Sequence, residues 1–132
     1  EGIKRFDNAL VIDSTYSEAY ALKATAIRLL GDMNYVTGTA YMDEAEEIAL
    51  KSLQFDVNHA QAYAVLANLY TQEHKRNAAD IAYRTALKLQ PNNALFNYWY
   101  ALLLRGQNKI EMSLMYNKKA KLLDPFHPVI HA

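Results

Sequence analysis

Residues 60–93 read AQAYAVLANLYTQEHKRNAADIAYRTALKLQPNN and contain two amphipathic helices in succession. One face of the first helix carries apolar residues at helical spacing: Tyr63, Leu66, Ala67 and Tyr70. The second helix has the same kind of face, formed by Ala79, Tyr83 and Ala86, and Pro91 ends it. Because small residues let helices approach closely, the stretch predicts an antiparallel helix pair.

The same pattern recurs 34 residues further along the chain. The matching residues there are Asn97, Tyr100, Ala101, Leu104, Ser113, Asn117, Ala120 and Pro125. Towards the N-terminus, the first-helix positions recur after a shift of 43 residues, as Tyr20, Lys23, Ala24 and Ile27. The longer shift indicates a nine-residue insertion within residues 31–41. Repeats of this length bury their apolar faces by stacking on one another.

This spacing resembles the tetratricopeptide repeat (TPR) pattern, in which Ala-x3-aromatic and a closing Pro follow a helix with Leu, small and aromatic positions. The resemblance implies an all-α, right-handed solenoid of antiparallel helix pairs with about seven helices. We expect helices near residues 2–13, 16–30, 41–55, 60–74, 77–90, 94–106 and 109–123. The expected division is a second helix of a truncated repeat at 1–15, repeats at 16–58, 59–93 and 94–127, and the start of a further helix at 128–132. The chain would then be a piece of a longer protein.

Composition narrows the function classes. The chain is 52% hydrophobic, has no cysteine, and therefore forms no disulfide or thiolate metal site. No apolar run approaches the roughly 20 residues of a membrane span, so we expect no membrane contact by this segment. The sequence does not decide the cellular compartment of this segment. We favour the cytoplasm, and the alternative is the periplasm if the full chain carries a membrane span before this segment.

Motifs for catalysis or cofactor binding are absent from the sequence. It has no Gly-rich phosphate loop, nucleophile elbow or HExxH motif. His127 and His131 are four residues apart, but Pro128 lies between them and no carboxylate accompanies them. We therefore expect no enzyme activity, no cofactor and no metal.

Charge argues against direct contact with nucleic acid. The 14 basic and 14 acidic residues give a net charge of zero, whereas helical repeats that bind RNA need a basic groove. An RNA-binding repeat therefore ranks last among the alternatives.

Acidic residues crowd residues 43–47 and lysines crowd residues 118–121. Both runs suit the helix dipole, and docking patches are the alternative interpretation.

The remaining class is protein binding. In the TPR family the first helix of each pair lines the concave face, where Lys, Asn and Arg can clamp a peptide carboxylate. The matching positions here hold Ala21, Thr25, Val65, Leu95 and Trp99, so this clamp is not expected. The positions that face the concave side instead predict an apolar groove with a few polar side chains in it. Its candidate residues are Leu22, Arg28, Gln61, Val65, Asn68, Thr71, Leu95, Tyr98, Trp99, Leu102 and Arg105.

Two interpretations of this groove stay open. It can hold an amphipathic helix or an extended hydrophobic segment of a protein or peptide partner. Alternatively, Tyr98 and Trp99 pack between neighbouring repeats, and the chain is a structural module that self-associates, for example as a homodimer. The insertion near 31–41 is either a surface loop or a lid at the edge of the groove.

The C-terminal stretch resembles a TPR subtype of bacterial signalling proteins. The matching elements are Trp99-Tyr100-Ala101-Leu102, Leu123-Asp124-Pro125 and Pro128-Val129-Ile130. Asn97 departs from the subtype, which has His at that position. Such modules follow winged-helix DNA-binding, class III cyclase or kinase domains. The resemblance therefore implies the sensory or regulatory part of a bacterial transcriptional regulator or signalling protein.

Overall fold

A computed structural model describes residue 3 and residues 16–34 and 38–131 of the chain. These residues form helices and connecting turns, with no strand among them. The helices are α2 (Ser17–Asp32), α3 (Ala40–Phe55), α4 (Ala60–Gln72), α5 (Arg76–Leu89), α6 (Ala94–Gly106) and α7 (Ile110–Leu123). The all-α fold expected from the sequence is confirmed. The helix expected at 2–13 lies outside the described residues, apart from Ile3.

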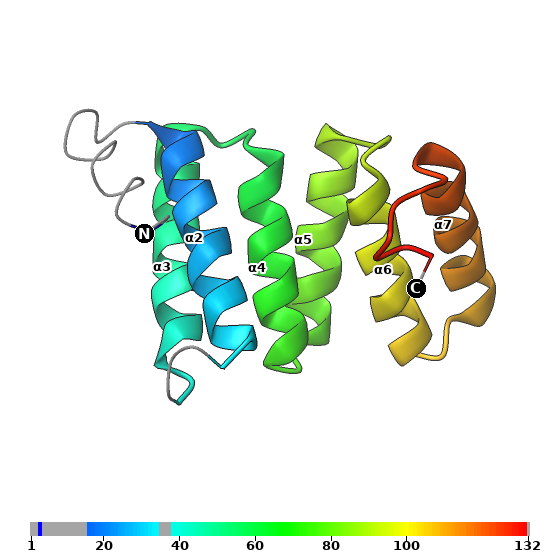
Figure 1. Ribbon diagram of the computed structural model, residues 1–132, viewed down its shortest axis with the longest axis horizontal. Helices are drawn as coiled ribbons and strands as arrows, with labels where there is room; N and C mark the ends of the chain where they lie inside the picture. Colours follow the sequence, from blue (N-terminus) through cyan, green and yellow to red (C-terminus); the bar gives the residue numbers. More distant parts are fainter. Residues whose placement is uncertain (1–2, 4–15, 35–37, 132) are drawn as a thin grey trace.

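The helices pack as successive antiparallel pairs. The most extensive contacts join α2 to α3, α4 to α5 and α6 to α7. Contacts also join α2 to α4 and α4 to α6, so the first helices of the pairs lie side by side (Figure 1). The result is a row of helix pairs in which α2, α4 and α6 share one face.

Small residues explain this close packing. Alanines on facing helices are fully buried, including Ala24 of α2, Ala45 and Ala49 of α3, and Ala67 of α4. Larger side chains fill the space beside these alanines, as Leu69 does in the core shared by α2, α3 and α4. Each fully buried Leu or Ile stabilises the fold by about 1.5–3 kcal/mol.

The same left-handed turn follows α2, α4 and α6. Its central residue has a positive φ in each case: 62° at Asn34, 61° at His74 and 62° at Asn108. After α4 the turn is closed by a hydrogen bond of 2.8 Å from Lys75 N to Tyr70 O. The equivalent bond after α6, from Lys109 N to Leu104 O, measures 2.9 Å. These two bonds show that the chain reverses in the same way in the α4–α5 pair and in the α6–α7 pair.

The ends of several helices differ from those expected. Helix α2 continues through Gly31 to Asp32, and α3 begins at Ala40. Gly31 suits this extension because a Cβ at that position would overlap the ring of Tyr41. The helix expected to start at Pro128 is a turn among the described residues, and a hydrogen bond of 3.2 Å from His131 N to His127 O spans it.

Asn97 departs from the repeat pattern for a local reason. It is fully buried at the start of α6. Its Nδ2 donates hydrogen bonds to Pro91 O, at 3.1 Å, and to Asn93 O, at 2.8 Å. The side chain therefore binds the turn between α5 and α6, where an apolar residue would leave both carbonyls without these donors.

Candidate functional site

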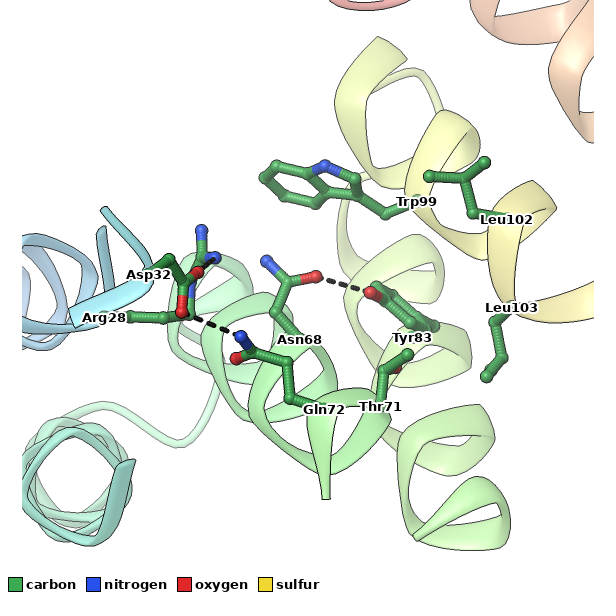
Figure 2. Close-up of a pocket in the computed structure, with 9 residues that line it drawn as sticks. All are labelled: Arg28, Asp32, Asn68, Thr71, Gln72, Tyr83, Trp99, Leu102 and Leu103. Carbon is green, nitrogen blue, oxygen red and sulfur yellow. Dashed lines mark hydrogen bonds and ion pairs between the residues drawn. The ribbon is translucent and has the colours of Figure 1, made fainter. Parts of the chain in front are cut away.

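A cavity of about 290 Å³ lies on the face formed by α2, α4 and α6 (Figure 2). Polar side chains from α2 and α4 form one wall, apolar side chains from α6 form the other, and one tyrosine of α5 lies between them. The lining residues are Arg28, Asp32, Asn68, Thr71, Gln72, Tyr83, Trp99, Leu102 and Leu103.

Asp32 organises the polar wall. Its carboxylate accepts hydrogen bonds from Arg28 Nη1 at 2.8 Å, from Tyr41 OH at 3.0 Å and from Gln72 Nε2 at 2.7 Å. These donors come from α2, α3 and α4, so one side chain ties three helices together at the edge of the cavity. The Arg28–Asp32 ion pair also leaves this wall without net charge.

Tyr83 and Asn68 form the second polar contact. The Tyr83 hydroxyl donates a hydrogen bond to Asn68 Oδ1. Burial raises the pKa of Tyr83 to about 12, although the Thr71 hydroxyl and the charge of Arg28 oppose this shift. Tyr83 therefore keeps its proton at neutral pH and remains a hydrogen-bond donor to Asn68.

Trp99 and Leu102 give the opposite wall its apolar character. The Trp99 ring packs on Phe96, with ring centroids 6.2 Å apart, and is half-buried. Leu102 is 41% exposed. Trp99 thus packs between helix pairs and also lines the cavity, which are the two roles that the sequence left open.

The cavity continues into a second one towards the end of α6. This neighbour measures about 220 Å³ and shares Thr71, Leu102 and Leu103 with the first. His74 and Gln107 are among its other lining residues. We call the two cavities together the trough.

Five of the predicted groove residues line the first cavity: Arg28, Asn68, Thr71, Trp99 and Leu102. The other exposed or half-buried candidates lie elsewhere on the same helices. They are Leu22, Gln61, Leu95, Tyr98 and Arg105.

Val65 requires a correction. It was expected in the groove, but it is 1% exposed and belongs to the core with Ala24 and Ile27. The close approach of α2 to α4 covers this position, so Val65 offers no surface to a partner.

The sequence prediction missed Asp32, Gln72, Tyr83 and Leu103. The sequence predicts a helix near 16–30, which places Asp32 in the inserted loop. Its spacing from Arg28, one helical turn, is the signal that could have extended α2. Tyr83 was assigned to packing alone, and its contact with Asn68 depends on how α5 lies against α4.

The structure also has candidate sites outside the trough. A cavity of about 320 Å³ is lined by side chains of α3, α4 and α5, including Leu50, Tyr63 and Ile81. Among the described residues, no group of three or more His, Asp or Glu side chains is placed to hold a metal ion. None of the described helices has the length and apolar character needed to cross a membrane.

Comparisons with known proteins identify the fold. No protein-family model and no curated protein matches the sequence. Among solved structures, a thermophilic TPR protein from Thermus thermophilus has a TM-score of 0.82 at 15% identity, covering 98% of this chain and 67% of its own. The O-GlcNAc transferase of Thermobaculum terrenum, solved as a mutant, has a TM-score of 0.77 at 20% identity, covering 90% of this chain and 21% of its own.

A third solved structure is YrrB, described as a TPR protein with an unusual peptide-binding site. Its TM-score is 0.73 at 22% identity, and the match covers 91% of this chain and 57% of YrrB. At these identities the comparisons establish the fold alone. The chain has the TPR fold that its sequence spacing predicts.

Proposed function

We propose that this chain holds a segment of a partner protein in the trough on the α2, α4 and α6 face. The observation that carries the proposal is the cavity whose walls differ in chemistry, with Arg28 and Asn68 facing Trp99 and Leu102. Such a surface suits a peptide, which presents both backbone polar groups and apolar side chains.

The apolar wall would supply most of the affinity. Trp99 is held by its contact with Phe96, so little side-chain entropy is lost when a ligand covers it. Tryptophan is also among the residues that most often dominate binding energy. YrrB, which shares the fold, is described as having a peptide-binding site, and this supports the proposal by analogy.

Selection from a peptide library tests this function. Displayed random peptides of about twelve residues, roughly 40 Å long when extended, are selected on the folded chain. The selected peptides are then titrated against Leu102→Glu, which places a charge in the trough, and against the control Leu114→Glu. Leu114 is 63% exposed on α7 and lines none of the cavities described above.

We expect Leu102→Glu to weaken binding at least tenfold and Leu114→Glu to leave it unchanged. An apolar ligand side chain that covers the Glu carboxylate takes this charge out of water without giving it a partner. The binding free energy then becomes weaker by about 1–3 kcal/mol. Since about 1.4 kcal/mol corresponds to tenfold in affinity, the expected loss is at least of that size. Equal affinity of both variants, or a library that yields no peptide, would overturn the proposal.

The context we propose is the sensory or regulatory part of a bacterial transcriptional regulator or signalling protein. The support is the C-terminal resemblance, which includes Trp99-Tyr100-Ala101-Leu102 and Leu123-Asp124-Pro125. Reading the encoding gene on both sides of this segment tests the context. A fused winged-helix, cyclase or kinase domain is expected, and a reading frame with repeats alone would contradict it.

Self-association is the second candidate function, and exposed apolar side chains on α7 favour it. Leu122 is 73% exposed and Met115 is 58% exposed, next to the lysines of residues 118–121. These exposed apolar side chains, on a helix at one end of the row (Figure 1), point to a second copy of the chain bound through α7.

Light scattering across protein concentrations tests this candidate. The molar mass should rise above 15.0 kDa with concentration, and Leu122→Lys should return it to the monomer value. A constant monomer mass at low salt, or a higher mass that Leu122→Lys leaves unchanged, would rule this contact out.

A further inference from the structure

A cavity of about 220 Å³, separate from the trough, lies between α5 and α7. Both helices pack against α6, but among the described residues they have no close contact with each other. Three basic side chains line this cavity, Arg84, Lys88 and Lys119, and no described acidic side chain does. Because the whole chain has equal numbers of basic and acidic residues, the cavity is a local concentration of positive charge.

The equivalent cavity of the preceding repeat shows that the fold does not require these charges. That cavity, of about 320 Å³, lies 34 residues earlier in the chain and is lined by side chains of α3, α4 and α5. Leu50 stands there at the position of Arg84, and Thr85 stands at the position of Lys119. An uncharged lining therefore satisfies the same packing, and the basic side chains call for another explanation.

The positive charge in the cavity is largely unpaired. Lys88 and Lys119 form no ion pair within the described part of the chain. Arg84 Nε lies 3.5 Å from Asp80 Oδ2, and the Arg84 side chain is 68% exposed. Asp80 also accepts a hydrogen bond of 2.6 Å from Tyr100, so it neutralises at most one of the three cations. An anion in the cavity would thus meet two lysines that have no carboxylate partner.

A buried acceptor without a partner belongs to the same cavity. Asn97 lines it and is fully buried. Its Nδ2 donates to Pro91 O and Asn93 O, and because carbonyls only accept, the Asn97 nitrogen must face this turn. This fixes the position of Oδ1, which has no hydrogen-bond partner among the described residues. Since an unpaired buried acceptor is unfavourable, the cavity suits a ligand that brings a donor.

The preceding repeat again provides the comparison. Its residue at the position of Asn97 is Tyr63, whose hydroxyl donates to Val57 O at 2.8 Å. Val57 corresponds to Pro91, so the two side chains bind the same carbonyl of the turn. The turn contact is therefore met by either residue, and Asn97 adds an acceptor that Tyr63 does not have.

An anion that carries its own proton matches both features. Hydrogen phosphate has two negative charges and one P–OH group, whereas sulfate and an ionised carboxylate have no proton to donate. A phosphate monoester loses its last proton with a pKa of about 6, so it also lacks a donor at neutral or higher pH.

We infer that this cavity binds hydrogen phosphate, with Arg84, Lys88 and Lys119 holding its negative charge and Asn97 Oδ1 accepting a hydrogen bond from its P–OH group. The inference concerns a second site of the chain and does not depend on the proposed function of the trough.

The role of Asn97 is tested from the ligand side on the native protein. Nitrogen-15 NMR follows titrations with sodium phosphate, sulfate and methyl phosphate at constant ionic strength and about pH 8, where all three are mainly dianions. Phosphate should give saturable shifts of the Asn97 side-chain amide and of the Lys119 backbone amide. Sulfate and methyl phosphate should bind roughly tenfold more weakly or worse, because neither donates to Oδ1.

The role of the cations is tested with a matched pair of variants. Lys119→Thr introduces the residue type that Thr85 already provides at the equivalent position, so the fold should tolerate it. Lys118→Thr removes the same charge from an exposed neighbour that does not line the cavity. Phosphate affinity should fall roughly tenfold in Lys119→Thr and stay within about twofold in Lys118→Thr. Circular dichroism and a urea melt establish that each variant is folded.

Three results would overturn the inference. Sulfate or methyl phosphate that binds as tightly as phosphate would show that Asn97 Oδ1 takes no part. Acetate that saturates the same shifts at the same concentration would make the ligand a carboxylate. Phosphate shifts that do not saturate in the millimolar range, or an equal loss in both lysine variants, would show only a general attraction of anions to surface lysines.

Discussion

The Tyr83 hydroxyl on α5 donates its hydrogen bond to the Asn68 side chain on α4, across the junction of one helix pair. A side chain that belongs to the core by position thus determines which end of a surface amide faces the trough. Tyr83 is 3% exposed, whereas Asn68 is half-buried at the cavity wall. The packing that stabilises the repeat and the chemistry offered to a ligand are therefore coupled at this pair.

Removing the Tyr83 hydroxyl should change how stability depends on pH. The pKa of Tyr83 is raised by burial from 10.0 in the unfolded chain to about 12 in the folded one. The folded state therefore holds the proton more tightly, and this contribution is complete below pH 10 and is lost as pH rises towards 12. Its size is roughly 3 kcal/mol at most.

Urea unfolding between about pH 8 and pH 11 measures this effect. The free energy of unfolding of the native chain should fall more steeply above pH 10 than that of Tyr83→Phe, by up to about 1.4 kcal/mol per pH unit. Burial and a hydrogen bond to Asp80 also raise the pKa of Tyr100 to about 12, so some slope remains in the variant. Parallel curves would show that Tyr83 titrates at its ordinary pKa.

Gly31→Ala should destabilise the fold at the end of α2. The added Cβ would overlap the Tyr41 ring and displace it from Asp32, to which its hydroxyl donates at 3.0 Å. We expect a loss of about 1–3 kcal/mol in the free energy of unfolding. Gly106→Ala is the control, because nothing lies within 4 Å of its Cβ.

The control should be neutral or gain up to about 1 kcal/mol, since alanine favours the helix over glycine. Urea denaturation of both variants gives the comparison. Equal stability of the two would mean that Tyr41 does not pack on Gly31.

His74→Gly should stabilise the turn after α4. His74 has a φ of 61°, a conformation in which a Cβ is crowded and glycine is not. We expect the free energy of unfolding to rise by up to about 1 kcal/mol. Lys75→Gly, at a φ of −87°, should instead lower it by about 0.5–1 kcal/mol. Thermal melts of the two variants check the opposite signs, and a shared sign would contradict the turn geometry.

Trp99 should report occupancy of the trough by its fluorescence. It is the single tryptophan of the chain and lines the cavity. An apolar ligand side chain placed against it removes water from the indole, so emission should move to shorter wavelengths as a selected peptide is added. Leu102→Glu should abolish this change. A peptide that binds by calorimetry while the emission spectrum stays constant would place its site elsewhere.

Much of the fold could be predicted because it is encoded locally. The apolar spacing of Tyr63, Leu66 and Tyr70 and the proline at Pro91 fall within one repeat, and repetition supplied the same signal again. Helix ends were less predictable. The end of α2 depends on the contact between Gly31 and Tyr41, which exists only once α3 packs on α2.

The candidate site was only partly predictable for a related reason. Register places Asn68, Trp99 and Leu102 on the shared face, but the bond between Gln72 and Asp32 joins residues 40 positions apart. No periodic pattern contains that pairing. Val65 was misplaced because its burial depends on how closely α2 approaches α4, and local spacing does not specify that distance.

Chemical-shift mapping with a peptide selected on the folded chain tests the central claim most directly. If the trough holds the partner segment, the largest changes should fall on the side-chain amides of Asn68 and Gln72 and on the indole N–H of Trp99. Changes confined to the cavity of Tyr63 and Ile81, or to α7, would contradict the account, because the partner would then bind outside the trough.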